Sequence, residues 1–157
     1  MKRLVRLLGF CALVLAPQAL TAQGVAGAWK LEYVRRVTND GSGEQAEMGH
    51  ARVVLDVRGD SVTATWQALE PGPDGKPLPP REIRGTVSGD HVVLKSQAQA
   101  RMMMNGNATT VELIITYDLT VKGDTIAGVQ LADAADGSMS PPARPIHGER
   151  EKAGAVF

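Results

Sequence analysis

A hairpin unit of six residues occurs three times in this chain and constrains its fold more than any other feature. The copies begin at Val57, Val87 and Val121, and each has the order Val, any residue, Gly, Asp, any residue, then Val or Ile. Glycine at the first central position supplies the positive φ of a two-residue type II′ turn, which matches the twist of the strands it joins. The sequence therefore predicts three tight antiparallel hairpins.

The turns also fix which residues face each other across each hairpin. If residues 59–60 form the first turn, Leu55 faces Ala64 and Val53 faces Trp66, so the apolar side chains of both strands share one side. The same rule applies to the second and third hairpins. The pairs predicted there are Val87 with Val92, Gly85 with Leu94, Val121 with Ile126, Leu119 with Gly128 and Tyr117 with Gln130.

Alternation of apolar and polar residues extends this pattern to the rest of the chain. It is clearest from Val111 to Val121 and recurs at Trp29, Leu31 and Tyr33. Tight turns alternate with longer connections at 39–49, 71–80, 105–107 and 133–142, which is typical of an up-and-down barrel with one closed and one open rim. The predicted fold is all-β, a single antiparallel barrel of eight strands at residues 26–37, 50–58, 61–69, 81–88, 91–101, 109–122, 125–132 and 143–151.

The first 22 residues have the features of a signal peptide. Lys2, Arg3 and Arg6 precede an apolar run from 7 to 15 that is too short to span a bilayer, and small residues end the segment. We expect residues 1–22 to be removed on export to the periplasm or the extracellular space, with cleavage after Thr21 as the alternative. Residues 24–152 then form the barrel domain, and 153–157 a flexible C-terminal tail.

Composition excludes several kinds of site and partner. The only cysteine, Cys11, lies in the signal segment, so the mature part has no disulfide and no thiolate metal site. Removing the three basic residues of that segment from the 17 in the chain leaves 14 against 17 acidic ones, a formal charge of −3. A negative chain with few aromatic residues disfavours nucleic acid and anionic membranes as partners. We expect no nucleic-acid partner, no stable membrane insertion and no cofactor.

Candidate catalytic and metal-binding residues are equally sparse. His50, His91 and His147 show no metal-ligand spacing, so no metal site is predicted. The turn aspartates Asp60, Asp90 and Asp124 occupy a position where Asp is favoured for backbone reasons. The chain has no G-x-S-x-G motif and no acid among the predicted inward positions. We expect a protein that is not an enzyme.

At Gly27-Ala28-Trp29 the first strand resembles the G-x-W opening of the calycin group, the lipocalins and avidins. The layout of residues 24–152 also resembles uncharacterised exported bacterial β-barrel domains with repeated V-x-G-D-x-[VI] hairpins and a basic terminal strand. The resemblance implies a meander barrel that binds small molecules. It also implies barrel closure by a late basic residue, Arg150, packed across Trp29. The chain lacks the many tryptophans of avidins, so biotin binding is not implied.

Two functions of different classes follow. The first is binding of a small apolar or amphipathic molecule inside the barrel, where small residues among larger ones would leave room. The second is a filled barrel that acts as an interaction module of the cell envelope and has no small ligand; the sequence identifies no protein partner. For the first function, the residues expected to line the interior are Tyr33, Leu55, Ala64, Trp66, Gly85, Leu94, Leu113, Ile115, Tyr117 and Gly128.

Overall fold

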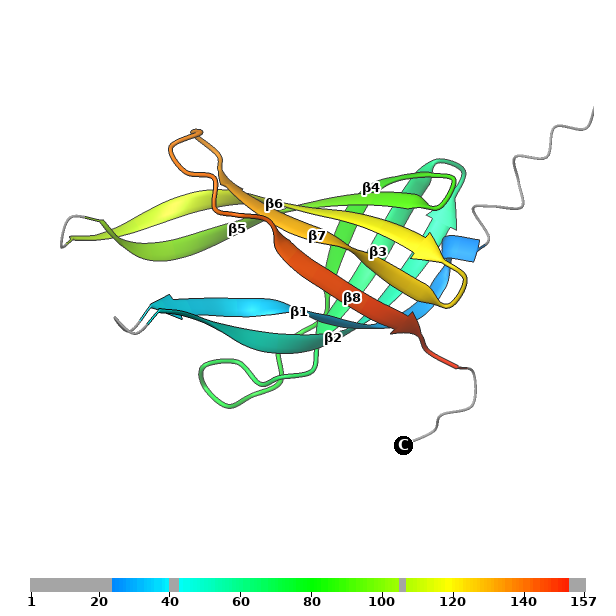
Figure 1. The fold of residues 1–157 in the computed structure, drawn as a ribbon, viewed down its shortest axis with the longest axis horizontal. Coiled ribbons are helices and arrows are strands. Elements are labelled where there is room, and N and C mark those ends of the chain that lie inside the picture. Colours follow the sequence, from blue (N-terminus) through cyan, green and yellow to red (C-terminus); the bar gives the residue numbers. More distant parts are fainter. Residues whose placement is uncertain (1–23, 40–42, 105–106, 153–157) are drawn as a thin grey trace, which may run out of the picture.

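The computed structural model describes residues 24–39, 43–104 and 107–152 and shows one closed β-barrel (Figure 1). Each strand pairs antiparallel with the next, and the eighth pairs with the first, so the predicted all-β class and eight-strand antiparallel barrel are confirmed. The predicted signal peptide and C-terminal tail lie outside the described residues. The strands are β1 (Gly27–Asn39), β2 (Glu44–Arg58), β3 (Ser61–Ala68), β4 (Arg81–Ser88), β5 (His91–Met104), β6 (Asn107–Lys122), β7 (Thr125–Ala134) and β8 (Arg144–Arg150).

The three Gly-Asp turns have the geometry that the sequence predicts. Gly59, Gly89 and Gly123 have φ values of 66°, 63° and 61°, in the region that only glycine adopts without strain. The predicted register is also confirmed in all three hairpins. All three turns lie at one end of the barrel, which we call the narrow end.

A repeated backbone hydrogen bond fastens each turn to the strand that follows its hairpin. In every case the carbonyl oxygen of the turn aspartate accepts from a backbone N–H of that later strand, at 2.8 or 2.9 Å. The N–H of Val87 donates to Asp60, that of Val121 to Asp90, and that of Arg150 to Asp124.

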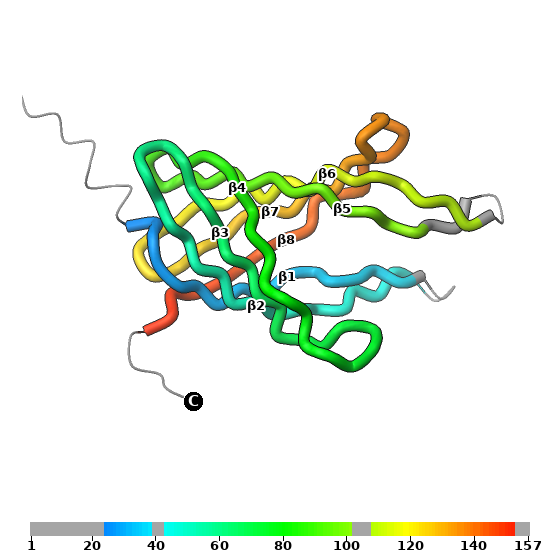
Figure 2. Tube along the Cα trace, turned by 180° about the vertical axis from the view of Figure 1, so that it is seen from behind, coloured from blue at the N-terminus to red at the C-terminus, as the bar shows by residue number. Residues whose placement is uncertain are grey.

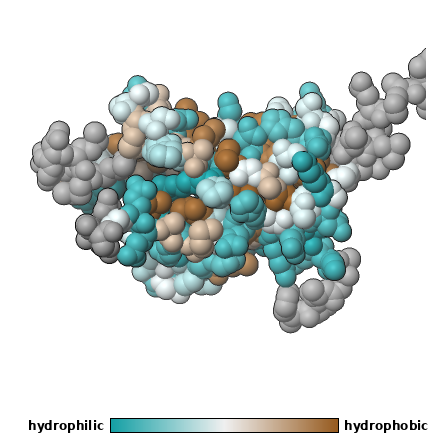
Figure 3. Space-filling model, viewed as in Figure 1, coloured by the Kyte–Doolittle hydropathy of each residue, from teal (hydrophilic) through white to brown (hydrophobic). Residues whose placement is uncertain are grey.

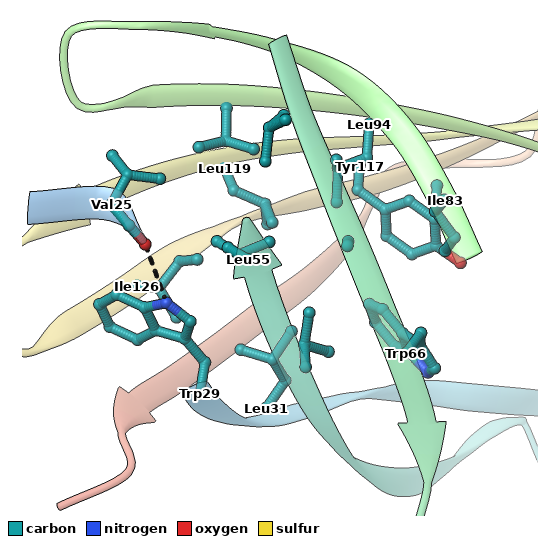
Figure 4. Close-up of a cluster of buried hydrophobic side chains, with 14 of the residues drawn as sticks. Val25, Trp29, Leu31, Leu55, Trp66, Ile83, Leu94, Tyr117, Leu119 and Ile126 are labelled. Atoms are coloured by element: carbon teal, nitrogen blue, oxygen red, sulfur yellow. Dashed lines mark hydrogen bonds between the residues drawn. The ribbon is translucent and has the colours of Figure 1, made fainter. Parts of the chain in front are cut away.

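The narrow end is also closed from inside. Val25, just before β1, is 1% exposed and its carbonyl oxygen accepts a hydrogen bond from Trp29 Nε1 at 3.1 Å. Trp29 itself is fully buried. From here the hydrophobic core continues along the barrel to Trp66 (Figure 4).

At the opposite, wide end the barrel separates into two ribbons (Figures 1 and 2). β1 stops pairing with β8 at Tyr33 but continues with β2 to Asn39. β5 stops pairing with β4 at Lys95 but continues with β6 to Met104. We call the extensions the β1–β2 ribbon (residues 34–39 and 44–48) and the β5–β6 ribbon (residues 96–104 and 107–115).

The β1–β2 ribbon corrects one sequence expectation. Residues 39–49 were expected to form a rim loop because they are rich in glycine, but residues 44–49 belong to β2 and pair with β1. The register of this pairing shifts by one residue at a bulge between Val34 and Arg36. Gly49 fits this pairing because a Cβ there would lie only 3.1 Å from the Tyr33 ring. The wide end is therefore bounded by strand on this side.

The connection between β3 and β4 lies beside the β1–β2 ribbon at the wide end (Figure 2). Arg35 Nη2 donates to the carbonyl oxygen of Pro71 at 3.2 Å, and Gln67 Nε2 donates to that of Leu78 at 2.9 Å. Within the described residues, no helix has the length and apolar character needed to cross a bilayer.

Candidate functional site

Part of the predicted lining belongs to the hydrophobic core. Leu55, Ala64 and Leu94 are at most 2% exposed and pack in the continuous buried cluster that fills the narrow half of the barrel. Such interiors are packed as densely as organic crystals. These three residues therefore belong to the core, and a binding site would lie nearer the wide end.

Gly85 and Gly128 mark close approaches between strands. A Cβ on Gly85 would lie 1.9 Å from the carbonyl oxygen of Val93, and a Cβ on Gly128 would lie 1.9 Å from that of Asp118. A glycine in a strand often marks such an approach by a neighbouring backbone. The expectation that these two glycines leave room inside the barrel is therefore wrong.

Three aromatic rings meet across the interior where the core ends. Tyr33 of β1 contacts Trp66 of β3 edge to face, with ring centroids 5.4 Å apart and an interplanar angle of 75°. Trp66 in turn contacts Tyr117 of β6 at 5.0 Å (Figure 4). These rings, which we call the aromatic layer, come from opposite sides of the barrel and separate the core from the wide end.

Arg81, a residue that the sequence analysis missed, completes this layer. Its guanidinium lies 5.5 Å from the centroid of the Trp66 ring, and Nη2 donates to the hydroxyl oxygen of Tyr117 at 2.9 Å. A signal was available in the sequence, because Arg81 alternates in step with Ile83 on the inward face of β4. In the described part of the chain, no carboxylate lies within ion-pair distance of Arg81.

The tyrosines of the aromatic layer are held in the neutral form. Burial raises the pKa of Tyr117 above its usual value of 10.0, although the nearby Arg81 opposes the shift. Burial also raises the pKa of Tyr33, and the negative charge of Glu70 adds to that effect. Both hydroxyls therefore keep their protons at neutral pH and can donate hydrogen bonds.

Beyond the aromatic layer the inward face is apolar but only partly covered. Ile115 and Leu113 continue the inward alternation of β6 and are half-buried. Their inward-facing neighbours on β5 and β7 include Ala98 and Ala132, which are also half-buried. We call these four residues the apolar wall. The space-filling view shows apolar surface between polar side chains on the face turned to the viewer (Figure 3).

Two buried polar atoms beside Tyr117 lack hydrogen-bond partners among the described residues. They are Oγ of Ser96 on β5 and Oε1 of Gln130 on β7. The Ser96 hydroxyl lies close to that of Tyr117 without the geometry of a hydrogen bond. A buried polar group left unpaired costs about 1 to 3 kcal/mol. Both atoms lie on inward-facing residues at the edge of the apolar wall.

An acid, Glu70, lies near Tyr33 of the aromatic layer. Glu70 Oε1 accepts hydrogen bonds from the backbone N–H and the ring Nδ1 of His50, at 2.6 and 2.8 Å. Although desolvation acts against it, these bonds hold the pKa of the Glu70 carboxyl below its usual value. Glu70 is therefore ionised at neutral pH, and Oε1 is already bound by His50.

The predicted closure residues lie together at the narrow end. Trp29 and Arg150 are partners in the β1–β8 pairing, and the guanidinium of Arg150 lies 4.2 Å from the centroid of the Trp29 ring. The guanidinium also donates to the carbonyl oxygen of Ala26 at 2.8 Å and to that of Gly24. Nε donates to Asp124 at 3.1 Å. This cluster joins the first strand to the last.

A separate groove of about 770 Å³ lies on the outside of the barrel, across β2, β1, β8 and β7. The side chains along it point outward by strand alternation and carry both signs of charge. They include Lys30, Glu32, Ala127, His147 and Glu149. The groove shares Arg150 with the predicted site residues but none of the predicted lining, so it is a different candidate from the wide end.

Metal-binding clusters are not found in the part of the chain that the structure describes, where no three His, Cys, Asp or Glu side chains are grouped to hold an ion. His50 and His91 each lie against a single acid, Glu70 and Asp118. His50 and His147 lie on either side of Glu32 along the outer groove, and His91 lies at the narrow end.

Comparisons with protein-family models, with curated proteins and with solved structures found no match. The structural assignment of this chain is accordingly a closed, eight-strand antiparallel β-barrel, with an aromatic layer and an apolar wall at its wide end.

Proposed function

We propose that this protein is an exported barrel that binds one small apolar or amphipathic molecule at its wide end and catalyses no reaction. The observation that carries the proposal is the combination, on one inward face, of a half-exposed apolar wall with the unpartnered polar atoms of Ser96 and Gln130. This combination is what a ligand site needs. Pockets for small molecules are mostly apolar, with a few polar groups that orient the ligand.

Both features favour a bound ligand. Apolar surface in contact with water costs about 25 cal/mol per Å² relative to burial, and each unpaired buried polar atom costs about 1 to 3 kcal/mol. An amphipathic molecule on the apolar wall would remove both costs, because it would cover the apolar side chains and supply hydrogen bonds at the aromatic layer.

Binding of the neutral dye N-phenyl-1-naphthylamine, whose emission rises in apolar surroundings, tests this proposal. Ala132→Phe places a ring on the inward face of β7 at the apolar wall and should reduce dye binding at least about tenfold. Ala127→Phe is the matched control, since it makes the same change on the outward face of the same strand, in the outer groove. It should leave binding unchanged.

The two variants distinguish the two sites. Loss of dye binding in Ala127→Phe but not in Ala132→Phe would place the site in the outer groove and contradict the proposal. No binding by the unsubstituted protein would also contradict it. Native mass spectrometry of protein purified from its own host adds a test without a dye, with a bound small molecule expected.

Export is part of the same proposal and is supported by the pattern of residues 1–22. N-terminal sequencing of protein recovered from the cell envelope or the medium should begin at Gln23 or, if cleavage follows Thr21, at Ala22. A chain that still begins at Met1 in the cell interior would contradict export.

The second candidate function, an interaction module without a small ligand, is favoured by a different observation. β1 beyond Tyr33 and β5 beyond Lys95 each have one side that is not paired with the neighbouring barrel strand. Free strand edges can accept a strand from another protein. Repeated preparations without a bound small molecule, together with no dye binding, would favour this function over the first.

A further inference from the structure

We propose that the ligand of the wide end carries a carboxylate, and that Arg81, Tyr117 and Ser96 bind it where β4 and β5 separate. This inference rests on the proposed function and adds the chemical class of the ligand. It starts from the fork between the two strands. Arg84 and Lys95 are the last paired residues, so Arg81 and Ser96 lie on opposite sides of the opening.

Three hydrogen-bond donors converge at this fork. Arg81 uses Nη2 to bind the Tyr117 hydroxyl oxygen at 2.9 Å, and a guanidinium has four further N–H groups. Because the Tyr117 oxygen accepts that bond, its own proton is available to a ligand. The Ser96 hydroxyl is buried beside it and has no hydrogen-bond partner in the described part of the chain. Such a set of donors suits the two oxygens of a carboxylate.

The charge at the fork points to an anion. Elsewhere in the barrel, Arg52 pairs with Glu151 at 2.6 Å and Arg84 with Glu82 at 2.8 Å. Within the described residues Arg81 has no such partner, although its guanidinium is fixed over Trp66. The negative charge of Glu70 raises the pKa of Tyr33, but Glu70 is hydrogen-bonded to His50 and does not pair with Arg81.

The apolar wall indicates the length and the apolar character of the rest of the ligand. Along β6, Leu113 is four positions from Tyr117, a length of roughly 14 Å at about 3.4 Å per residue. An acyl chain of medium length would extend along Ile115 and Leu113 with its carboxylate at the fork. A neutral molecule of the same length would gain the apolar contact but would leave Arg81 unpaired.

The test compares decanoate with decanol, two probes with the same carbon chain and different heads. Trp29→Phe leaves Trp66, which belongs to the aromatic layer, as the only tryptophan and the reporter of binding. In this background decanoate should bind about tenfold or more tightly than decanol, as expected for hydrogen bonds between charged groups. Arg81→Gln should lower the affinity for decanoate to that for decanol and leave the affinity for decanol unchanged.

Arg84→Gln is the matched control, because Arg84 lies on the same strand, points outward and should affect neither probe. If Arg81→Gln does not fold, Ser96→Ala provides the second test. It should lower the affinity for decanoate and leave the affinity for decanol unchanged. Equal affinity for both probes, or equal weakening of both by Arg81→Gln, would overturn the carboxylate site and leave the proposed function standing. Failure of both probes to bind would overturn both proposals.

Discussion

Replacement of Arg150 by alanine should destabilise the barrel by about 3 kcal/mol. A guanidinium over an indole contributes about 0.5 to 2 kcal/mol, and a hydrogen bond from a charged donor about 1.5 to 3 kcal/mol. The Arg150 side chain is 26% exposed, and its partner Asp124 is 79% exposed, so we assign nothing to that ion pair and take low values for the other contacts. These contacts are the Trp29 ring and the carbonyl oxygens of Ala26 and Gly24.

Urea denaturation followed by circular dichroism measures this loss. Arg58→Ala is the control, because Arg58 is 85% exposed and pairs with the exposed Asp56, so its replacement should cost within about 0.5 kcal/mol. A Trp66→Phe background makes Trp29 the only tryptophan, and its emission should change when Arg150 is lost. A cost below about 1 kcal/mol together with unchanged emission would refute the role of Arg150 in closure.

Three further predictions concern stability. Gly128→Ala should cost about 2 kcal/mol or more in urea, because its Cβ meets backbone, whereas Gly24→Ala, where the space is open, should cost within about 0.5 kcal/mol. Valine at any one of the three turn glycines should cost about 1 to 2 kcal/mol in thermal unfolding, since the space is open there and only the positive φ resists the change; an unaltered Tm would contradict this. Because the folded pKa of Tyr117 lies above the unfolded value of 10.0, stability should fall as pH rises above 10.0. Tyr117→Phe should reduce that fall when urea curves at about pH 8 and 11 are compared.

Much of the fold could be predicted from the sequence because its information is local. A Gly-Asp turn fixes the register of both its strands, and one correct register places every side chain of the hairpin. The pairing of Leu55 with Ala64 and of Leu119 with Gly128 follows from the turns alone. The limits of the β1–β2 ribbon could not be predicted in this way, because a run rich in glycine can be either a loop or a strand that packs closely.

The candidate site was harder to predict because it depends on contacts across the barrel. Strand alternation indicates that Trp66 and Tyr117 point inward, but it does not show that their rings meet or that Arg81 joins them. Nor does it give the depth at which the core ends. The glycines illustrate the same limit. The sequence suggests free space beside Gly85 and Gly128, but in the structure the backbone of a neighbouring strand occupies that space.

The bonds from the turn aspartates make the narrow end cooperative. Each hairpin is held by a strand outside itself, so no single hairpin can detach without breaking a bond to the next part of the chain. In hydrogen exchange, the amides of Val87, Val121 and Arg150 should therefore open only when the whole domain unfolds. The β1–β2 ribbon and the part of the β5–β6 ribbon beyond Leu113 are each paired along one side only, and they can fray without disturbing this rim. The molecule thus combines a narrow end that unfolds as one unit with a wide end whose ribbons can open separately from it.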